Sequence, residues 1–481
     1  MNMKNKTIIK MNMKKKYLNI PLGIWIILIA VVSFFYLIYC YSDIIWTTKN
    51  GLTIWYILAD KKNIGEFYAT PYPLDNNVQH AYYDFFIYII FAIWNLPLFI
   101  YEKITHISFA NNYVTVLYAK MIVIPFLIGC SYFVYKIVIE LTSDLEKAGW
   151  SVFSFLFSIM SFQAIIVMNG YDVISLFFTL LGIRAYLKKD NFKFVLSFAC
   201  AIACKMFALW IFIPFILLRH KSILKIAKEF VLGISFIVIP KIYFVLFEKI
   251  IGMDTLIDGV DNAISSPMYI DEYLWSGEAP LAVSSMPLFF VLTFTLWTLC
   301  WFNKKDVSKR GIIYIALLSM SVFILTCDTH PQWIILLMPY IAILECIDWN
   351  DLSMKLFTEI SMGSSAMLWQ VRRRPQCYSY NIVNNMLHLE TGDREFWYTG
   401  IWTFISKLSD TVGIQMEHIW TLFRSILVAS ALLLLYELIP RKSSLDELPQ
   451  NGRRIFYIKC TFSIIYLLVP LLGVIVRSMG Y

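Results

Sequence analysis

Long apolar runs, separated by short polar or basic segments, account for most of this chain. A run of about 20 apolar residues is long enough to cross the hydrocarbon core of a bilayer as an α-helix. No segment shows the alternation of polar and apolar positions that predicts a β-strand. We therefore expect an all-α, polytopic transmembrane bundle that crosses the membrane roughly ten times. The expected spans are residues 21–40, 113–140, 150–168, 173–187, 230–247, 287–302, 312–327, 333–347, 419–438 and 457–476.

Basic segments between the runs predict the orientation of the bundle, because loops rich in lysine and arginine stay on the cytoplasmic side. The basic segments are the N-terminal residues 1–20 and the loops 188–193, 219–228, 303–310 and 441–454. We therefore expect a plasma-membrane protein with a cytoplasmic N-terminus. The first apolar run lacks a small-residue cleavage site, so we interpret it as a retained helix and not as a signal peptide.

Two apolar segments cannot be simple spans if these basic loops share one side. The segments 194–203 and 206–218 are separated by Lys205 and have basic loops at both outer ends. This arrangement predicts a re-entrant hairpin of two half-helices. The run 85–101 is interrupted by Pro97, and it should lie along the external surface or enter the membrane and return. A large first external loop, residues 42–112, would then contain surface-lying helices.

The composition agrees with a membrane protein and excludes some functions. Hydrophobic residues make up 59% of the chain and charged residues 15%, compared with about 25% charged residues in a soluble domain. The formal net charge of +8 does not indicate a nucleic-acid partner, because the lysines and arginines flank apolar runs. The nine cysteines show no metal-ligand spacing, so we expect no metal site.

Four polar clusters fall on the expected external face. One is the long first loop, and the other three are at helix junctions. They contain Asp43, the residues 169–172 and the residues 328–332. Ionisable residues at membrane depth are costly and commonly mark function, although a single aspartate at a helix start can equally be a cap or a solvated turn. Lys205 lies inside an apolar segment. It needs an anionic partner there, or it must extend to the cytoplasmic head groups.

Several short motifs resemble those of the GT-C glycosyltransferases, membrane enzymes that use polyprenyl-phosphate sugars. The motifs are Asn-Gly-Tyr-Asp at 169–172, the lysines at 188–189, the half-helix with Lys205 and Pro214, and His-Pro-Gln-Trp at 330–333. Within that superfamily the chain looks most like the bacterial mannosyltransferase-type branch. The resemblance covers about the first 345 residues. The first loop lacks the paired acidic motif of protein O-mannosyltransferases.

The resemblance implies an inverting sugar transfer from a polyprenyl-phosphate donor to an acceptor hydroxyl on the external face. Asp43 lies where such enzymes carry an acidic residue and would be the general base. The lipid-linked sugar is a co-substrate, no other cofactor is expected, and the acceptor could be a saccharide, a lipid or a protein. Lys120 and His330 are candidates for binding the phosphate. The full set of expected substrate-binding residues is Lys120, Tyr171, Asp172, Lys205, His330 and Gln332.

The C-terminal third leaves alternatives open. We divide the chain into the basic segment 1–20, a GT-C-like catalytic module at 21–347 and a transmembrane region of unassigned role at 348–481. If the weaker run 356–369 is a span, the arginines at 372–374 are external and could bind an anion; otherwise they are cytoplasmic. The alternative functions are a polysaccharide polymerase and a lipid-linked-sugar flippase or transporter.

Overall fold

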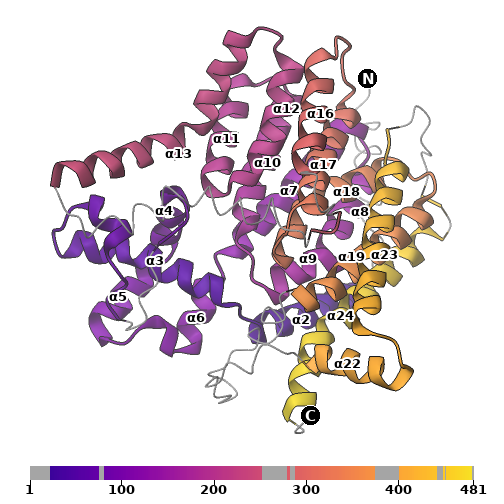
Figure 1. Cartoon of the computed structure of the whole chain (residues 1–481), viewed down its shortest axis with the longest axis horizontal. Coiled ribbons are helices and arrows are strands. Elements are labelled where there is room, and N and C mark those ends of the chain that lie inside the picture. Colours follow the sequence, from indigo (N-terminus) through magenta and orange to yellow (C-terminus); the bar gives the residue numbers. More distant parts are fainter. Residues whose placement is uncertain are drawn as a thin grey trace, which may run out of the picture.

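The structure is a computed structural model that describes residues 22–74, 81–251, 279–281, 288–373, 400–440, 448–449 and 451–478. The N-terminal segment 1–20, Arg374, most of the loop 250–286 and part of the loop 441–454 lie outside the described residues. Every element of regular structure in the described residues is a helix (Figure 1), which confirms the all-α prediction. Among them, four helices are long and apolar enough to cross a membrane, or six if two bent pairs count as single spans. Several expected spans are therefore short or interrupted helices.

The helices that follow the first apolar helix, α2 (Leu22–Ile38), form a group beside the main bundle at the lower left of Figure 1. The predicted span at 85–101 lies in this group and is not straight. Its two helices are bent by 66° at Asn95, and Pro97 is in the first turn of the second helix. The group consists of α3 (Ser42–Ala59), η1 (Ile64–Ala69), α4 (Phe85–Trp94), α5 (Leu96–Thr105), η2 (Phe109–Asn111) and α6 (Tyr113–Lys120).

The main bundle is centred on α10, which packs against α7 and α11. Its long helix α13 extends away from the bundle towards the α3–α6 group (Figure 1). The bundle consists of α7 (Val123–Thr142), α8 (Leu145–Leu156), α9 (Ile159–Ser161), η3 (Phe162–Val167), α10 (Asp172–Leu187), α11 (Asn191–Cys204), η4 (Met206–Ala208), α12 (Leu209–Arg219), α13 (Ile223–Ile251), α16 (Leu288–Phe302), α17 (Lys309–Thr326), η6 (Pro331–Leu336) and α18 (Met338–Ile347).

The predicted break at Lys205 is confirmed. Helix α11 ends at Cys204, and Lys205 has an extended backbone with φ −156° and ψ 128°. The chain then folds back, because rings at similar distances from the turn meet: Phe198 packs on Phe212 at 5.2 Å, and Arg219 lies 5.2 Å from the Phe194 ring. The two half-helices therefore form a hairpin with Lys205 at its tip. Its depth in a membrane stays a prediction.

The polar clusters and the basic loops lie at opposite ends of the bundle. Lys188, which follows α10, pairs with Glu140 at 3.1 Å, and Lys309 at the start of α17 donates to the Glu140 carbonyl. At the opposite ends of α10 and α17, Gly170 and Gln332 are neighbours, because a Cβ added at Gly170 would lie 3.2 Å from the Gln332 side chain. This arrangement agrees with the predicted polarity. Which end faces the cytoplasm stays a prediction.

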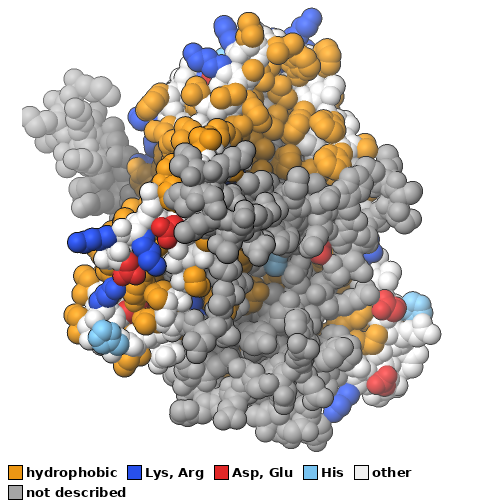
Figure 2. Space-filling view, turned by 60° about the vertical axis from the view of Figure 1, so that its left-hand side comes forward, with side chains coloured by type: hydrophobic (Ala, Val, Ile, Leu, Met, Phe, Trp, Pro, Cys, Tyr) orange, Lys and Arg blue, Asp and Glu red, His pale blue; other side chains and the backbone are white. Residues whose placement is uncertain are grey.

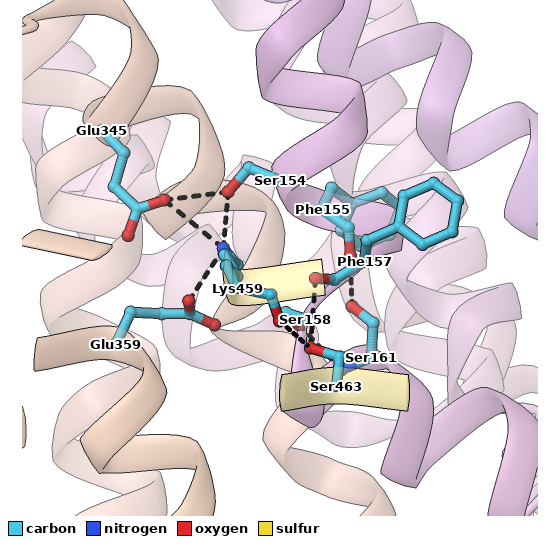
Figure 3. Close-up of polar contacts among 9 residues, drawn as sticks. All are labelled: Ser154, Phe155, Phe157, Ser158, Ser161, Glu345, Glu359, Lys459 and Ser463. Atoms are coloured by element: carbon cyan, nitrogen blue, oxygen red, sulfur yellow. Dashed lines mark hydrogen bonds and ion pairs between the residues drawn. The ribbon is translucent and has the colours of Figure 1, made fainter. Parts of the chain in front are cut away.

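The C-terminal helices pack into the same bundle. They are α19 (Leu352–Arg373), α22 (Gly400–Val412), α23 (Met416–Glu437) and α24 (Gly452–Ser478). Helix α24 contacts α9, η3 and α19. Figure 3 shows how Lys459 of α24 meets Glu345 of α18 at 3.7 Å and Glu359 of α19 at 2.8 Å. Gln370 donates to the Thr329 carbonyl, so α19 carries the backbone of Arg373 towards the end of the bundle where Thr329 lies.

Candidate active site

Asp43 lies in the first turn of α3, directly after the first apolar helix. The residue as a whole is half-buried, and its carboxylate is not used to cap the helix, because no side-chain hydrogen bond caps the start of α3. Instead, the hydroxyls of Tyr83 and Tyr171 donate to Asp43 Oδ1 over 3.4 and 3.5 Å. The structure therefore supports neither a capping role nor a fully solvated turn for this aspartate.

The environment of Asp43 favours its protonated form more than water does. Burial raises the pKa of Asp43 to about 6; the Lys205 ammonium and the two tyrosine hydrogen bonds lower that pKa, and the Asp172 carboxylate raises it. A carboxyl group with a pKa near neutrality can accept and release a proton under physiological conditions, which is what a general base requires.

The segment before α10 has an irregular backbone that positions Asp172. A π-helix, η3, ends at Val167, and Asn169 then adopts a left-handed conformation with φ 47°. A Cβ at Gly170 would lie 2.9 Å from the Ala164 carbonyl oxygen, so only glycine fits without a shift. π-Helical turns inside α-helical segments frequently occur at functional sites. The Asn169 side chain also accepts from the Tyr41 N–H at 3.4 Å, which joins this segment to the start of α3.

Lys205 extends from the tip of the α11–α12 hairpin to the same place. Its Nζ is 3.8 Å from Asp172 Oδ1, and both side chains are buried. It also lies over the rings of Tyr83 at 3.8 Å and Tyr171 at 4.8 Å. Of the two roles considered for this lysine, the structure shows the first, because its partner is an anion within the protein. The 3.8 Å separation is longer than a direct hydrogen bond.

A second ion pair, which the sequence reasoning missed, lies next to this cluster. Lys241 of α13 pairs with Asp84, the residue before α4, at 3.2 Å. The Tyr83–Asp84 segment therefore contacts both lysines. Lys241 lies within the apolar run 230–247, and a lysine inside an expected span could have been noted as an outlier. Its distant partner could not have been identified from the sequence.

The contacts of Lys120 do not favour a role in phosphate binding. Its side chain is fully buried, and its ammonium donates to the backbone carbonyls of Tyr36, Leu37 and Tyr39. A lysine ammonium has three N–H donors. All three have acceptors at the end of α2, so Lys120 holds that helix against α6 and we leave it out of the proposed site.

His330 and Gln332 have different neighbours although they are close in sequence. Gln332 is buried and packs beside Gly170, so it belongs to the Asp172 side of the site. His330 packs on Trp333 and lines a small cavity together with Gln163 and Gln370. Neither Asp43 nor Asp172 nor Lys205 lines that cavity. The structure thus brings together Asp43, Tyr171, Asp172, Lys205 and Gln332.

No group of three or more His, Cys, Asp or Glu side chains that could hold a metal ion occurs within the described ranges. The chain matches no protein-family profile and no curated protein. Among solved structures it is similar to that of ArnT from Cupriavidus metallidurans bound to undecaprenyl phosphate, with a TM-score of 0.41 and 11% sequence identity over 94% of this chain and 78% of that chain. A likeness at this level carries no inference, so function is argued from the residues of this chain.

Proposed function

We propose that the protein is a membrane glycosyltransferase that transfers a sugar from a polyprenyl-phosphate donor to an acceptor hydroxyl on the external face. The observation that supports this most directly is the convergence of Asp43, Asp172 and Lys205, since Lys205 pairs with Asp172 and lies over the two tyrosines that donate to Asp43. A proton acceptor and a cation are the two groups that this reaction requires from a protein.

The reaction would proceed by a single displacement with inversion. The acceptor oxygen attacks the anomeric carbon, the bond from that carbon to the phosphate oxygen breaks, and the lipid phosphate leaves with the electron pair. Asp43 takes the proton of the acceptor hydroxyl, because its carboxyl group has a pKa of about 6 and is mostly ionised at neutral pH. Asp172 and its partner Lys205 orient the site around that base.

The leaving phosphate needs positive charge, and two lysines could supply it. Lys205 is 3.8 Å from Asp172, which is too long for a direct hydrogen bond, and Lys241 pairs with the neighbouring Asp84 at 3.2 Å. The ammonium group of each lysine could stabilise the lipid phosphate dianion that forms when the sugar is transferred. The Lys205 ammonium also lies over two tyrosine rings, which hold it in place through cation–π attraction without neutralising it.

A flippase or transporter would require ionisable residues along a path through the membrane. The buried charged cluster around Lys459 is inside the bundle, but its three charged side chains are at most 1% exposed. Charges enclosed in this way contact one another and not a solute, so we favour transfer over transport. A polymerase would perform related chemistry at the same site, and the acceptor decides between the two.

The test is sugar transfer by the purified protein from a polyprenyl-phosphate sugar, with wild type and Asp43→Asn compared at matched folded fraction. Removal of a general base typically costs about 10²–10⁴-fold in rate. Asp60→Asn, at the other end of α3 and exposed, is the matched control and should leave the rate unchanged. Near-equal rates for wild type and Asp43→Asn would remove Asp43 from the mechanism and direct attention to Asp172.

A further inference from the structure

The end of the bundle opposite Asp43 contains a large cavity that the proposed reaction does not use. It has a volume of about 570 Å³ and lies between the loop after α10, the end of α12 and the loop before α17. The charged and polar residues that line it are Lys189, Asn191, Arg219, Lys305, Asp306 and Lys309. Four cations and one carboxylate face the same space, so an anion is the ligand that this lining favours.

The side chains of two of these cations form neither an ion pair nor a hydrogen bond with the described residues. Arg219 pairs with Glu229 at 3.6 Å, and Lys309 donates to the Glu140 carbonyl at 3.4 Å. By contrast, the exposed Lys189 and Lys305 form no ion pair with any described residue. Lys189 has a left-handed backbone with φ 59° in the turn after α10.

Backbone geometry adds to the positive potential. Helices α11 and α17 both begin at the cavity, at Asn191 and Lys309 respectively. Each start has a side-chain cap, because Asp190 accepts from the Lys193 N–H and Ser308 accepts from the Gly311 N–H; the helix macrodipoles still favour a nearby anion. The hairpin at Lys205 also returns the end of α12, at Arg219, to the cavity that Asn191 lines.

The surroundings of the cavity indicate where its ligand comes from. Phe192 and Phe302, beside the cavity in sequence, are 75% and 72% exposed, and Trp301 is 39% exposed. Figure 2 shows basic side chains at the upper end of the molecule above a face that is mainly hydrophobic. Basic side chains above an apolar face match the border between lipid acyl chains and head groups. A soluble anion would need the cations but not the exposed aromatic rings.

We propose that this cavity binds the phosphate head group of an anionic phospholipid, in the leaflet opposite the Asp43 end. The head group occupies the space between the two basic loops, where Lys189 and Lys305 contact it, and the acyl chains lie along the exposed aromatic residues. The ligand would link the hairpin that carries Lys205 to α17. It is separate from the polyprenyl-phosphate donor, which the proposed reaction uses at the other end.

The experiment compares lipid retention by the purified full chain, using native mass spectrometry after exchange into phosphatidylglycerol or phosphatidylcholine. The variants are Lys189→Gln/Lys305→Gln and the matched control Lys61→Gln/Lys62→Gln. The control removes the same charge from an exposed site, and Lys61 has a left-handed backbone with φ 55° like Lys189. Each basic side chain near an anionic lipid is worth about fivefold in binding, so the double variant should lose about 25-fold.

The expected result is retention of phosphatidylglycerol by wild type and by the control, loss in the Lys189/Lys305 variant, and weak binding of phosphatidylcholine. Equal retention of both lipids, or equal loss in both double variants, would overturn the proposal. Inorganic phosphate is the competitor that distinguishes a soluble anion. If millimolar phosphate displaces phosphatidylglycerol completely, the cavity binds free anions and the lipid assignment is wrong.

Discussion

Two charged clusters in this protein have the same composition, two carboxylates and one lysine, but different geometry and burial. One contains Asp43, Asp172 and Lys205, and the other contains Glu345, Glu359 and Lys459 (Figure 3). In the second, the Lys459 ammonium contacts Glu359 at 2.8 Å, and Ser154 at 2.7 Å links it to Glu345. All three charged side chains are at most 1% exposed, and each lies inside a continuous helix.

The first cluster is looser and more open. Lys205 is 3.8 Å from Asp172, it comes from an interrupted helix, and Asp43 is half-buried. In the enclosed cluster around Lys459, the charged groups contact one another and hold α8, α18, α19 and α24 together. An open cluster leaves charge for a ligand. The exposure and spacing of such charges, and not their number, therefore distinguish a packing element from a reaction site.

The largest effect that tests this comparison is expected for Lys459→Met. Removing one partner of a buried ion pair leaves uncompensated charge and costs about 3–5 kcal/mol. The free energy of unfolding in detergent should fall by that amount, while transfer per folded molecule stays close to wild type. Lys193→Met is the control, because Lys193 is 68% exposed in its pair with Asp190 and its loss should change stability far less. Equal stability of the two variants would contradict a packing role for Lys459.

A smaller effect, on rate, is expected for Lys205→Gln. Removing a group that stabilises developing charge costs about 10²–10³-fold in rate, measured at matched folded fraction. Lys103→Gln is the control, because Lys103 also lies over aromatic rings, at 4.7 Å from Tyr56, but in an exposed part of the first loop. If Lys205→Gln loses stability as severely as Lys459→Met and keeps its rate, the two clusters have the same role.

The smallest effect is the pH dependence that Asp43 predicts. The carboxylate is the active form, and burial raises its pKa from 3.8 to about 6. Activity should therefore be nearly constant above neutral pH and fall about tenfold per pH unit well below pH 6, as the base becomes protonated. The residual rate of Asp43→Asn should show no such decline. A wild-type profile that stays flat down to pH 4 would exclude a base with this pKa.

Part of the candidate site could be predicted from local signals. The position of Asp43 after the first apolar run, the Asn-Gly-Tyr-Asp turn before α10 and the lysine that interrupts residues 194–218 are all visible in the sequence. Basic loops then place these residues at one end. Lys120 shows the limit of such signals. Its ammonium donates to three backbone carbonyls, but nothing in the neighbouring sequence distinguishes it from a lysine that contacts a substrate.

The sequence by itself determined the helical class, the approximate positions of the apolar segments and the break at Lys205, because hydropathy and charge act within a few residues along the chain. Only the tertiary structure decided which charges meet. Glu345 and Lys459 are 114 positions apart, and Asp84 and Lys241 are 157 positions apart. Such pairs depend on how each helix is rotated against its neighbours, and that rotation results from side-chain packing over the whole bundle.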